Sequence, residues 1–225
     1  MLDVRRSWFL FFAICLTAFG ATNDTVVSDV SSTSFMAGAD ARELYNAGTQ
    51  DLHAGKLEEA ETLLEASLAR QDEPVQPVAL FNLGYVRFGQ GTAELKKSPA
   101  AGATGQRSQA VNQAAVAAIQ NAADALAGND VRQMVQAYLA GHGVHREMHA
   151  AMKAVQSALA AYGKTLTKWQ RAMNDFQSAA ELNPADTNAV RNAKIIGQAI
   201  ARLVDSFRQL RQSAAGLGQN QQQLA

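Results

Sequence analysis

Apolar residues recur along most of this chain with the spacing of helical faces. Residues three and four apart share one face of an α-helix, and one such face is formed by Leu57, Ala60, Leu63, Leu64 and Leu68. The same spacing predicts helices over residues 40–52, 57–69, 78–90, 108–127, 131–140, 144–182 and 189–212. No run alternates with the period of two that a strand requires. The pattern therefore predicts an all-α fold.

Glycine, proline and short polar residues mark the expected ends of these helices. Gly55 supplies the positive φ of a tight turn, and two prolines lie between residues 72 and 77. The composition of residues 92–106 is that of a loop. Asp130 is a candidate N-cap, and Gly141-His142-Gly143 predicts an interruption of the helix that begins after it.

Two short runs share one skeleton and indicate an internal repeat. Leu44-Tyr45-Asn46-Ala47-Gly48 is followed by Gly55, and Leu80-Phe81-Asn82-Leu83-Gly84 is followed by Gly91. The second run begins about 36 residues after the first, close to the roughly 34-residue period of the tetratricopeptide (TPR) helix-turn-helix. Small residues are expected where the two helices of a repeat approach, and Gly91, like Gly55, is expected in a turn. The alternative is an ordinary helical bundle whose glycines are C-caps.

The repeat pattern returns near the C-terminus. Aromatic, small and terminating positions of a second TPR helix are matched by Trp169, Ala172, Phe176, Ala179 and Pro184. We interpret residues 78–90 and 165–182 as the two helices of one repeat, split by an inserted helical hairpin over about 92–164. Phe88 is then expected near Trp169. A degenerate repeat helix over 114–126 is the alternative.

The N-terminus has the pattern of a secretory signal. Arg5 and Arg6 precede an apolar run from Trp8 to Phe19, which is short for a bilayer span. The predicted organisation is a signal peptide (1–20), a flexible lead-in (21–37), a helical domain (38–212) and a Gln-rich disordered tail (213–225). The protein is expected to be periplasmic or secreted. The alternative is an inner-membrane anchor formed by residues 8–20, and an uncleaved signal is the only membrane attachment expected.

Composition narrows the classes of partner. The formal net charge is zero, which gives no electrostatic footprint for nucleic acid. The single cysteine, Cys15, lies inside the expected signal, so neither a disulfide nor thiol chemistry is expected of the mature chain. No cofactor is expected.

Several of these runs resemble a bacterial family. Leu80-Phe81-Asn82-Leu83-Gly84, Ala172-Met173 with Phe176, and Leu182-Asn183-Pro184 with Asp186, Ala189 and Asn192 are similar to the exported TPR proteins of bacterial aerotolerance (Bat) operons. Those proteins are encoded beside von Willebrand factor A-domain proteins and a MoxR-type ATPase. The resemblance implies other proteins as partners, with A-domain envelope proteins among them. The insertion over 92–164 departs from the family pattern.

Repeat geometry predicts a concave groove lined by the first helix of each repeat. The groove residues expected from the three first helices are Arg42, Tyr45, Asn46, Thr49, His53, Phe81, Asn82, Tyr85, Phe88, Asn188, Arg191 and Asn192. Asparagine amides can bond a peptide backbone, and aromatic side chains anchor interfaces. The asparagines can equally join neighbouring helices to each other.

Three histidines suggest a metal site as an alternative to a protein-binding groove. His142, His145 and His149 share a face if the helix is unbroken, so a metal-binding envelope protein is the competing hypothesis. Glu147 lies about 200° round the helix from His145 and cannot act as a base beside a metal there. We find no catalytic set and predict that the protein is not an enzyme. The combined prediction is a periplasmic TPR scaffold that binds partner proteins through its groove.

Overall fold

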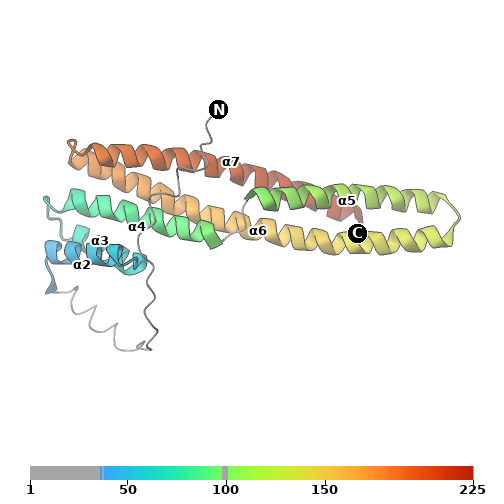
Figure 1. The fold of residues 1–225 in the computed structure, drawn as a ribbon, viewed down its shortest axis with the longest axis horizontal. Helices are drawn as coiled ribbons and strands as arrows, with labels where there is room; N and C mark the ends of the chain where they lie inside the picture. The colour runs from blue at the N-terminus through green and yellow to red at the C-terminus, as the bar shows by residue number, and fades with distance from the viewer. Residues whose placement is uncertain (1–35, 37, 98–100, 225) are drawn as a thin grey trace. The chain divides into compact units, whose positions relative to one another are not determined.

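The computed structural model describes residues 36, 38–97 and 101–224, and Ala39–Ala225 forms one compact unit. The described residues contain no strand, so the all-α prediction is confirmed (Figure 1). The expected signal, residues 1–20, lies outside the described part, and no helix within that part is long and apolar enough to cross a membrane. The helices are α2 (Ala41–His53), α3 (Leu57–Ala69), α4 (Gln76–Lys97), α5 (Ala101–Ala127), α6 (Val131–Leu182) and α7 (Thr187–Leu224).

Helices α2 and α3 form a tight hairpin. Asp40 caps α2 by a reciprocal pair of bonds with Glu43, at 2.8 and 3.0 Å, which satisfies two backbone N–H groups that lack helical partners. Gly55 turns the chain with a φ of 76°, as the sequence predicts. A Cβ on Gly48 would lie 2.9 Å from Cγ of Leu64, so the glycine allows the two helices to approach.

Helix α4 packs on two sides. One side joins α2 and α3 in a core that includes Ala60, Leu64, Leu83 and Val86. The other side packs on the second half of α6, which belongs to a larger core shared with α5 and α7. Because α4 serves both cores, it connects the α2–α3 hairpin to the rest of the unit.

The second half of α6 runs antiparallel to α4. The rings of Phe88 and Trp169 stack with centroids 5.2 Å apart, and the indole Nε1 of Trp169 donates to the carbonyl of Phe88 at 3.2 Å. One turn away, the Thr165 hydroxyl donates to the carbonyl of Gly91 at 3.1 Å. The prediction that Phe88 lies near Trp169 is therefore confirmed.

The first half of α6 pairs with α5, and α7 lies along both. Val111 and Ala115 of α5 share a core with Met148, Ala151 and Val155 of α6. Near the end of α7, Asn220 donates to Asn112 of α5 at 3.1 Å, and Gln221 lies 3.2 Å from the ring nitrogen of His149 on α6. The hairpin of α5 and α6 continues beyond this point (Figure 1).

Two predicted breaks in the chain are wrong. Helix α6 continues through Gly141-His142-Gly143, since each helical glycine costs only about 1 kcal/mol and Met148 and Ala151 hold the helix on α5. The loop expected over 92–106 is also mostly helical. Helix α4 runs to Lys97 and α5 begins at Ala101.

Two further segments differ from the expectation. Gly91 is not in a turn but is buried inside α4, where a Cβ would lie 2.5 Å from the indole ring of Trp169. Residues 213–224, expected to be disordered, continue α7 as helix. Leu217 is fully buried there. Its packing stabilises the helix, although the glutamine-rich composition of this segment gives no sign of it.

Gly84 offers a test of the contact between α4 and α6. A Cβ at this position would lie 2.7 Å from the ring of Phe176. We expect Gly84→Leu to lower the free energy of unfolding by about 1–3 kcal/mol through overpacking, measured by urea denaturation. Gly163→Ala is the matched control, because a Cβ on Gly163 of α6 meets nothing within 4 Å. Equal stability of the Gly84 variant and the wild type would contradict the contact.

Candidate functional site

The predicted groove residues lie on α2, α4 and α7, which are joined by side-chain hydrogen bonds. Asn82 of α4 donates to the hydroxyl of Thr49 at 2.9 Å and to that of Tyr45 at 3.4 Å, both on α2. Asn192 of α7 donates to the hydroxyl of Tyr85 on α4 at 3.0 Å. The two asparagines therefore connect neighbouring helices, which is one of the two roles expected from the sequence.

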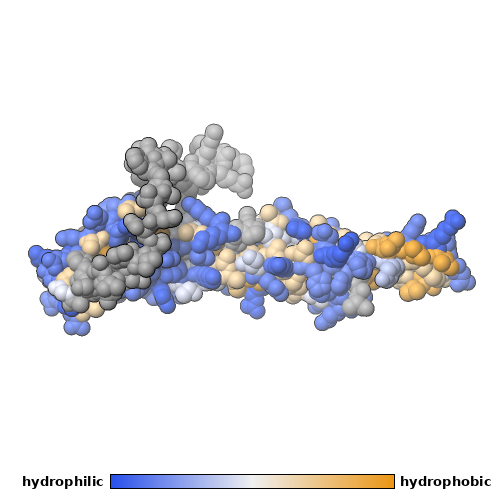
Figure 2. All heavy atoms as spheres, turned by 90° about the horizontal axis from the view of Figure 1, so that it is seen from below, coloured by the Kyte–Doolittle hydropathy of each residue, from blue (hydrophilic) through white to orange (hydrophobic). Residues whose placement is uncertain are grey.

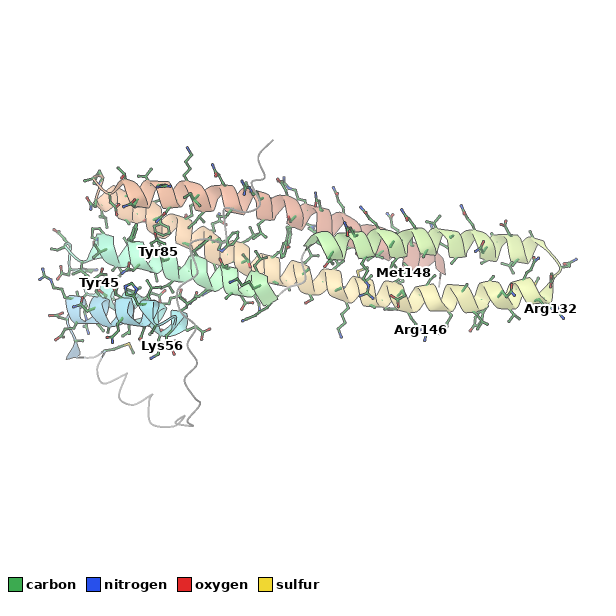
Figure 3. All side chains as sticks on the ribbon, viewed as in Figure 1. Tyr45, Lys56, Tyr85, Arg132, Arg146 and Met148 are labelled. Carbon is green, nitrogen blue, oxygen red and sulfur yellow. The ribbon has the colours of Figure 1, made fainter. Side chains whose placement is uncertain are left out.

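The aromatic residues of α4 divide between the surface and the core. Phe81 and Tyr85 make edge contacts with each other and with Phe176, at centroid distances of 5.2–5.3 Å. Tyr85 remains 44% exposed, and Figure 3 shows it on α4. Phe88 is half-buried against Trp169. Of the predicted aromatic anchors on α4, Tyr85 is thus the one most open to a partner.

The remaining predicted residues keep their polar groups in solvent. Arg42, Asn46 and Arg191 are exposed, and neither arginine makes an ion pair within the described part of the chain. His53 and Asn188 are exposed as well. The predicted surface therefore includes the exposed ring of Tyr85 and two arginines that make no ion pair within the described residues.

A partly buried ionic network centred on Arg87 is a feature that sequence reasoning missed. Its guanidinium donates to both carboxylate oxygens of Asp175 on α6, at 2.9 and 3.0 Å. On α3 it bonds Glu61, with Nε to Oε1 at 2.9 Å, and also Glu65. Lys168 reaches the second oxygen of Glu61 at 3.1 Å. Three carboxylates thus share two cations across α3, α4 and α6.

The carboxylates in this network differ in acidity. Burial raises the pKa of Asp175 to about 6; Arg87 opposes this effect, while the neighbouring charges of Glu61 and Glu65 add to it. Burial alone would raise the pKa of Glu61, but its hydrogen bonds from Arg87, Gln90 and Lys168 outweigh that effect and lower the pKa. Asp175 is therefore the group of the network that titrates near neutral pH.

One sequence signal could have found part of this network. Glu61 and Glu65 are four residues apart, so they lie on one face of α3, and Arg87 stands in an otherwise apolar stretch of α4. Glu61 follows two exposed glutamates, Glu58 and Glu59, so its residue type alone does not distinguish it from a solvated surface residue. Asp175, the other partner of Arg87, lies 88 residues further along the chain, and no local sequence pattern connects the two.

The histidines do not form a cluster of three. The rings of His145 and His149 lie edge to face at 4.7 Å, whereas His142 lies beside Tyr138 at 6.3 Å. In the described residues, no three His, Cys, Asp or Glu side chains are placed to hold a metal ion.

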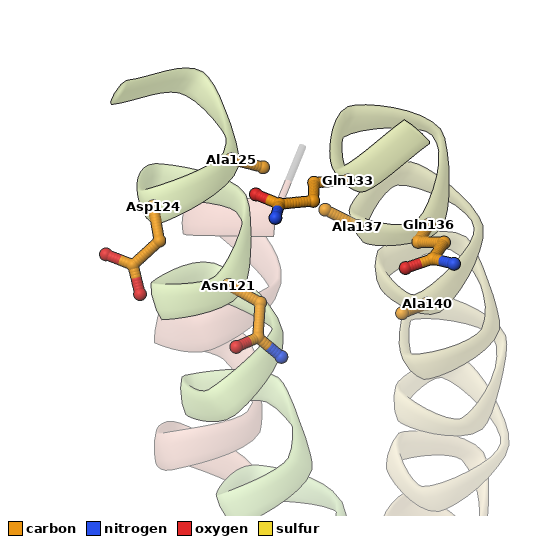
Figure 4. A pocket seen from close by; sticks show the side chains of 7 residues that line it. All are labelled: Asn121, Asp124, Ala125, Gln133, Gln136, Ala137 and Ala140. Carbon is orange, nitrogen blue, oxygen red and sulfur yellow. The ribbon is translucent and has the colours of Figure 1, made fainter. Parts of the chain in front are cut away.

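A polar crevice lies between α5 and α6 near their connecting turn. Asn121 and Asp124 come from α5, and Gln133 and Gln136 from α6 (Figure 4). Alanine side chains complete its lining. The lining of the crevice offers amides and one carboxylate but no cation or nucleophile, so it does not suggest a catalytic site.

Comparisons of the chain with protein-family models, with curated proteins and with solved structures gave no match.

The Arg87 network predicts a dependence of stability on pH. The pKa of Asp175 is raised on folding from its unfolded value of about 3.9, so its contribution to stability is present below pH 4 and is lost as the pH rises through about 6. We expect a loss of about 2–3 kcal/mol between pH 4 and pH 7 from this group. In Asp175→Asn, urea unfolding should show a flatter profile over that window. Parallel profiles for variant and wild type would contradict the assignment.

Proposed function

We propose that this protein is a non-catalytic scaffold that binds partner proteins through the surface formed by α2, α4 and α7. The observation that carries the proposal is the row of side chains across these helices. Hydrogen bonds among Tyr45, Asn82, Tyr85 and Asn192 connect α2 to α4 and α4 to α7, while Arg191 is exposed. A rigid surface with an exposed aromatic ring suits protein recognition because little side-chain freedom is lost on binding.

A TPR-like arrangement is part of this proposal. Helices α2 and α3 would form the first repeat, and α4 with the second half of α6 the second. In support, Gly48 meets Leu64 in the first pair, and Gly84 meets Phe176 in the second. These are equivalent places in the two sequence runs. Helix α7 would then be the first helix of a third unit and would complete the row of first helices.

An envelope location is also proposed. It rests on the basic residues and short apolar run before residue 20 and on the resemblance to exported TPR proteins. Under this proposal the partner is another envelope protein, for which von Willebrand A-domain proteins are the first candidates. The hairpin of α5 and the first half of α6 would project from the scaffold as the inserted part.

The test begins with a partner captured from envelope extract and then purified. We expect Tyr85→Ala combined with Arg191→Ala to weaken its binding by about 1–3 kcal/mol, measured by calorimetry. Asn82 is left unchanged because it joins α2 to α4. Glu59→Ala is the control, since Glu59 is exposed on α3, outside this surface.

Two outcomes would count against the proposal. Unchanged affinity in the double variant, with a native circular dichroism spectrum, would exclude the α2–α4–α7 surface. If deletion of residues 108–160 then abolished binding, the α5–α6 hairpin would be the interaction surface instead.

A further inference from the structure

Large apolar side chains are exposed where α5 and α6 extend beyond the end of α7. Leu126, Val131 and Tyr138 are 75%, 70% and 71% exposed, and Val116, Val135 and Leu139 are also exposed. We call the surface formed by these six residues the tip groove. Figure 2 shows apolar residues gathered at that end of the unit.

The tip groove continues the surface of α5 and α6 on which the end of α7 packs. Asn112 of α5 and His149 of α6 contact the end of α7. Steps of four and three residues along α5 lead from Asn112 to Val116 and on to Leu126. Similar steps along α6 lead from His149 back to Tyr138 and Val131. Residues at such steps share one helical face, so the face that α7 covers runs on without a cover in the described part of the chain.

We propose that the tip groove is a self-association surface that binds the tip groove of a second copy of this chain. Two helical hairpins that meet on their apolar faces form a four-helix bundle, which is a stable way to bury such stripes. The six side chains hold on the order of 600 Å² of accessible surface per copy, and twice that area is at the lower end of a stable protein interface. The formal net charge of zero adds no long-range repulsion between copies.

The position of α7 sets the direction of the pairing. It fills the groove at the base of the hairpin, so a second hairpin laid in the same direction would meet its partner's α7. In the antiparallel arrangement each tip instead ends against the other copy's α7. Tyr138 lies midway along the tip groove and would face its own counterpart.

Sedimentation velocity of the full chain over a range of concentrations tests the proposal. We expect a monomer–dimer equilibrium whose dissociation constant rises at least 100-fold in Val135→Lys combined with Tyr138→Lys. Gln133→Lys combined with Gln136→Lys is the matched control, because it adds the same charge to α6 on the side of the polar crevice. We expect the control to dimerise like the wild type.

A cross-link provides a readout that does not depend on a destabilising variant. In a Cys15→Ser background, Tyr138→Cys should form an intermolecular disulfide rapidly, and Gln136→Cys should not. A monomeric wild type at the highest concentration, or a dimer unaffected by the lysine variants, would overturn the proposal. Binding of the monomer to anionic lipid vesicles, lost in the Val135/Tyr138 variant alone, would overturn it in favour of a membrane surface.

Discussion

The close approach of α4 to the second half of α6 is the constraint on which the rest of the structure depends. Gly84 and Gly91 leave room for the rings of Phe176 and Trp169, which lie where a Cβ would stand. Because protein interiors are closely packed, a larger residue at either glycine would displace these rings. Because α6 continues unbroken for 52 residues, fixing its second half on α4 also fixes where its first half carries α5.

Polar contacts add specificity to this packing. Arg87 bonds carboxylates on both neighbouring helices, α3 and α6. Moving any one helix would leave a buried charge without its partner, which is expensive. Because α2 packs on α3 and α7 packs on α6, the positions of α3, α4 and α6 also influence the proposed binding surface on α2, α4 and α7.

Local pattern was sufficient for most of the helices and for one distant contact. Phe88 and Trp169 can be paired from the sequence because each matches a position of the TPR sequence pattern, although the chain between them is long. The sequence predicts Gly91 in a turn, because the residues next to it give no sign of the Trp169 ring on which it packs. Arg87 and Glu61 were missed as a pair because ion pairs between helices leave no periodic signal in sequence. The helix break expected at Gly141-His142-Gly143 does not occur, because tertiary packing outweighs the low helix propensity of glycine.

The contact between glycine backbone and aromatic rings can be observed directly in solution. In an isotope-edited NOESY spectrum of the labelled protein, we expect cross-peaks from the Gly84 Hα protons to the ring of Phe176. We also expect cross-peaks between the rings of Phe88 and Trp169. Assigned spectra that lack both sets of cross-peaks would contradict the pairing of α4 with α6, and with it the positions of the proposed surfaces.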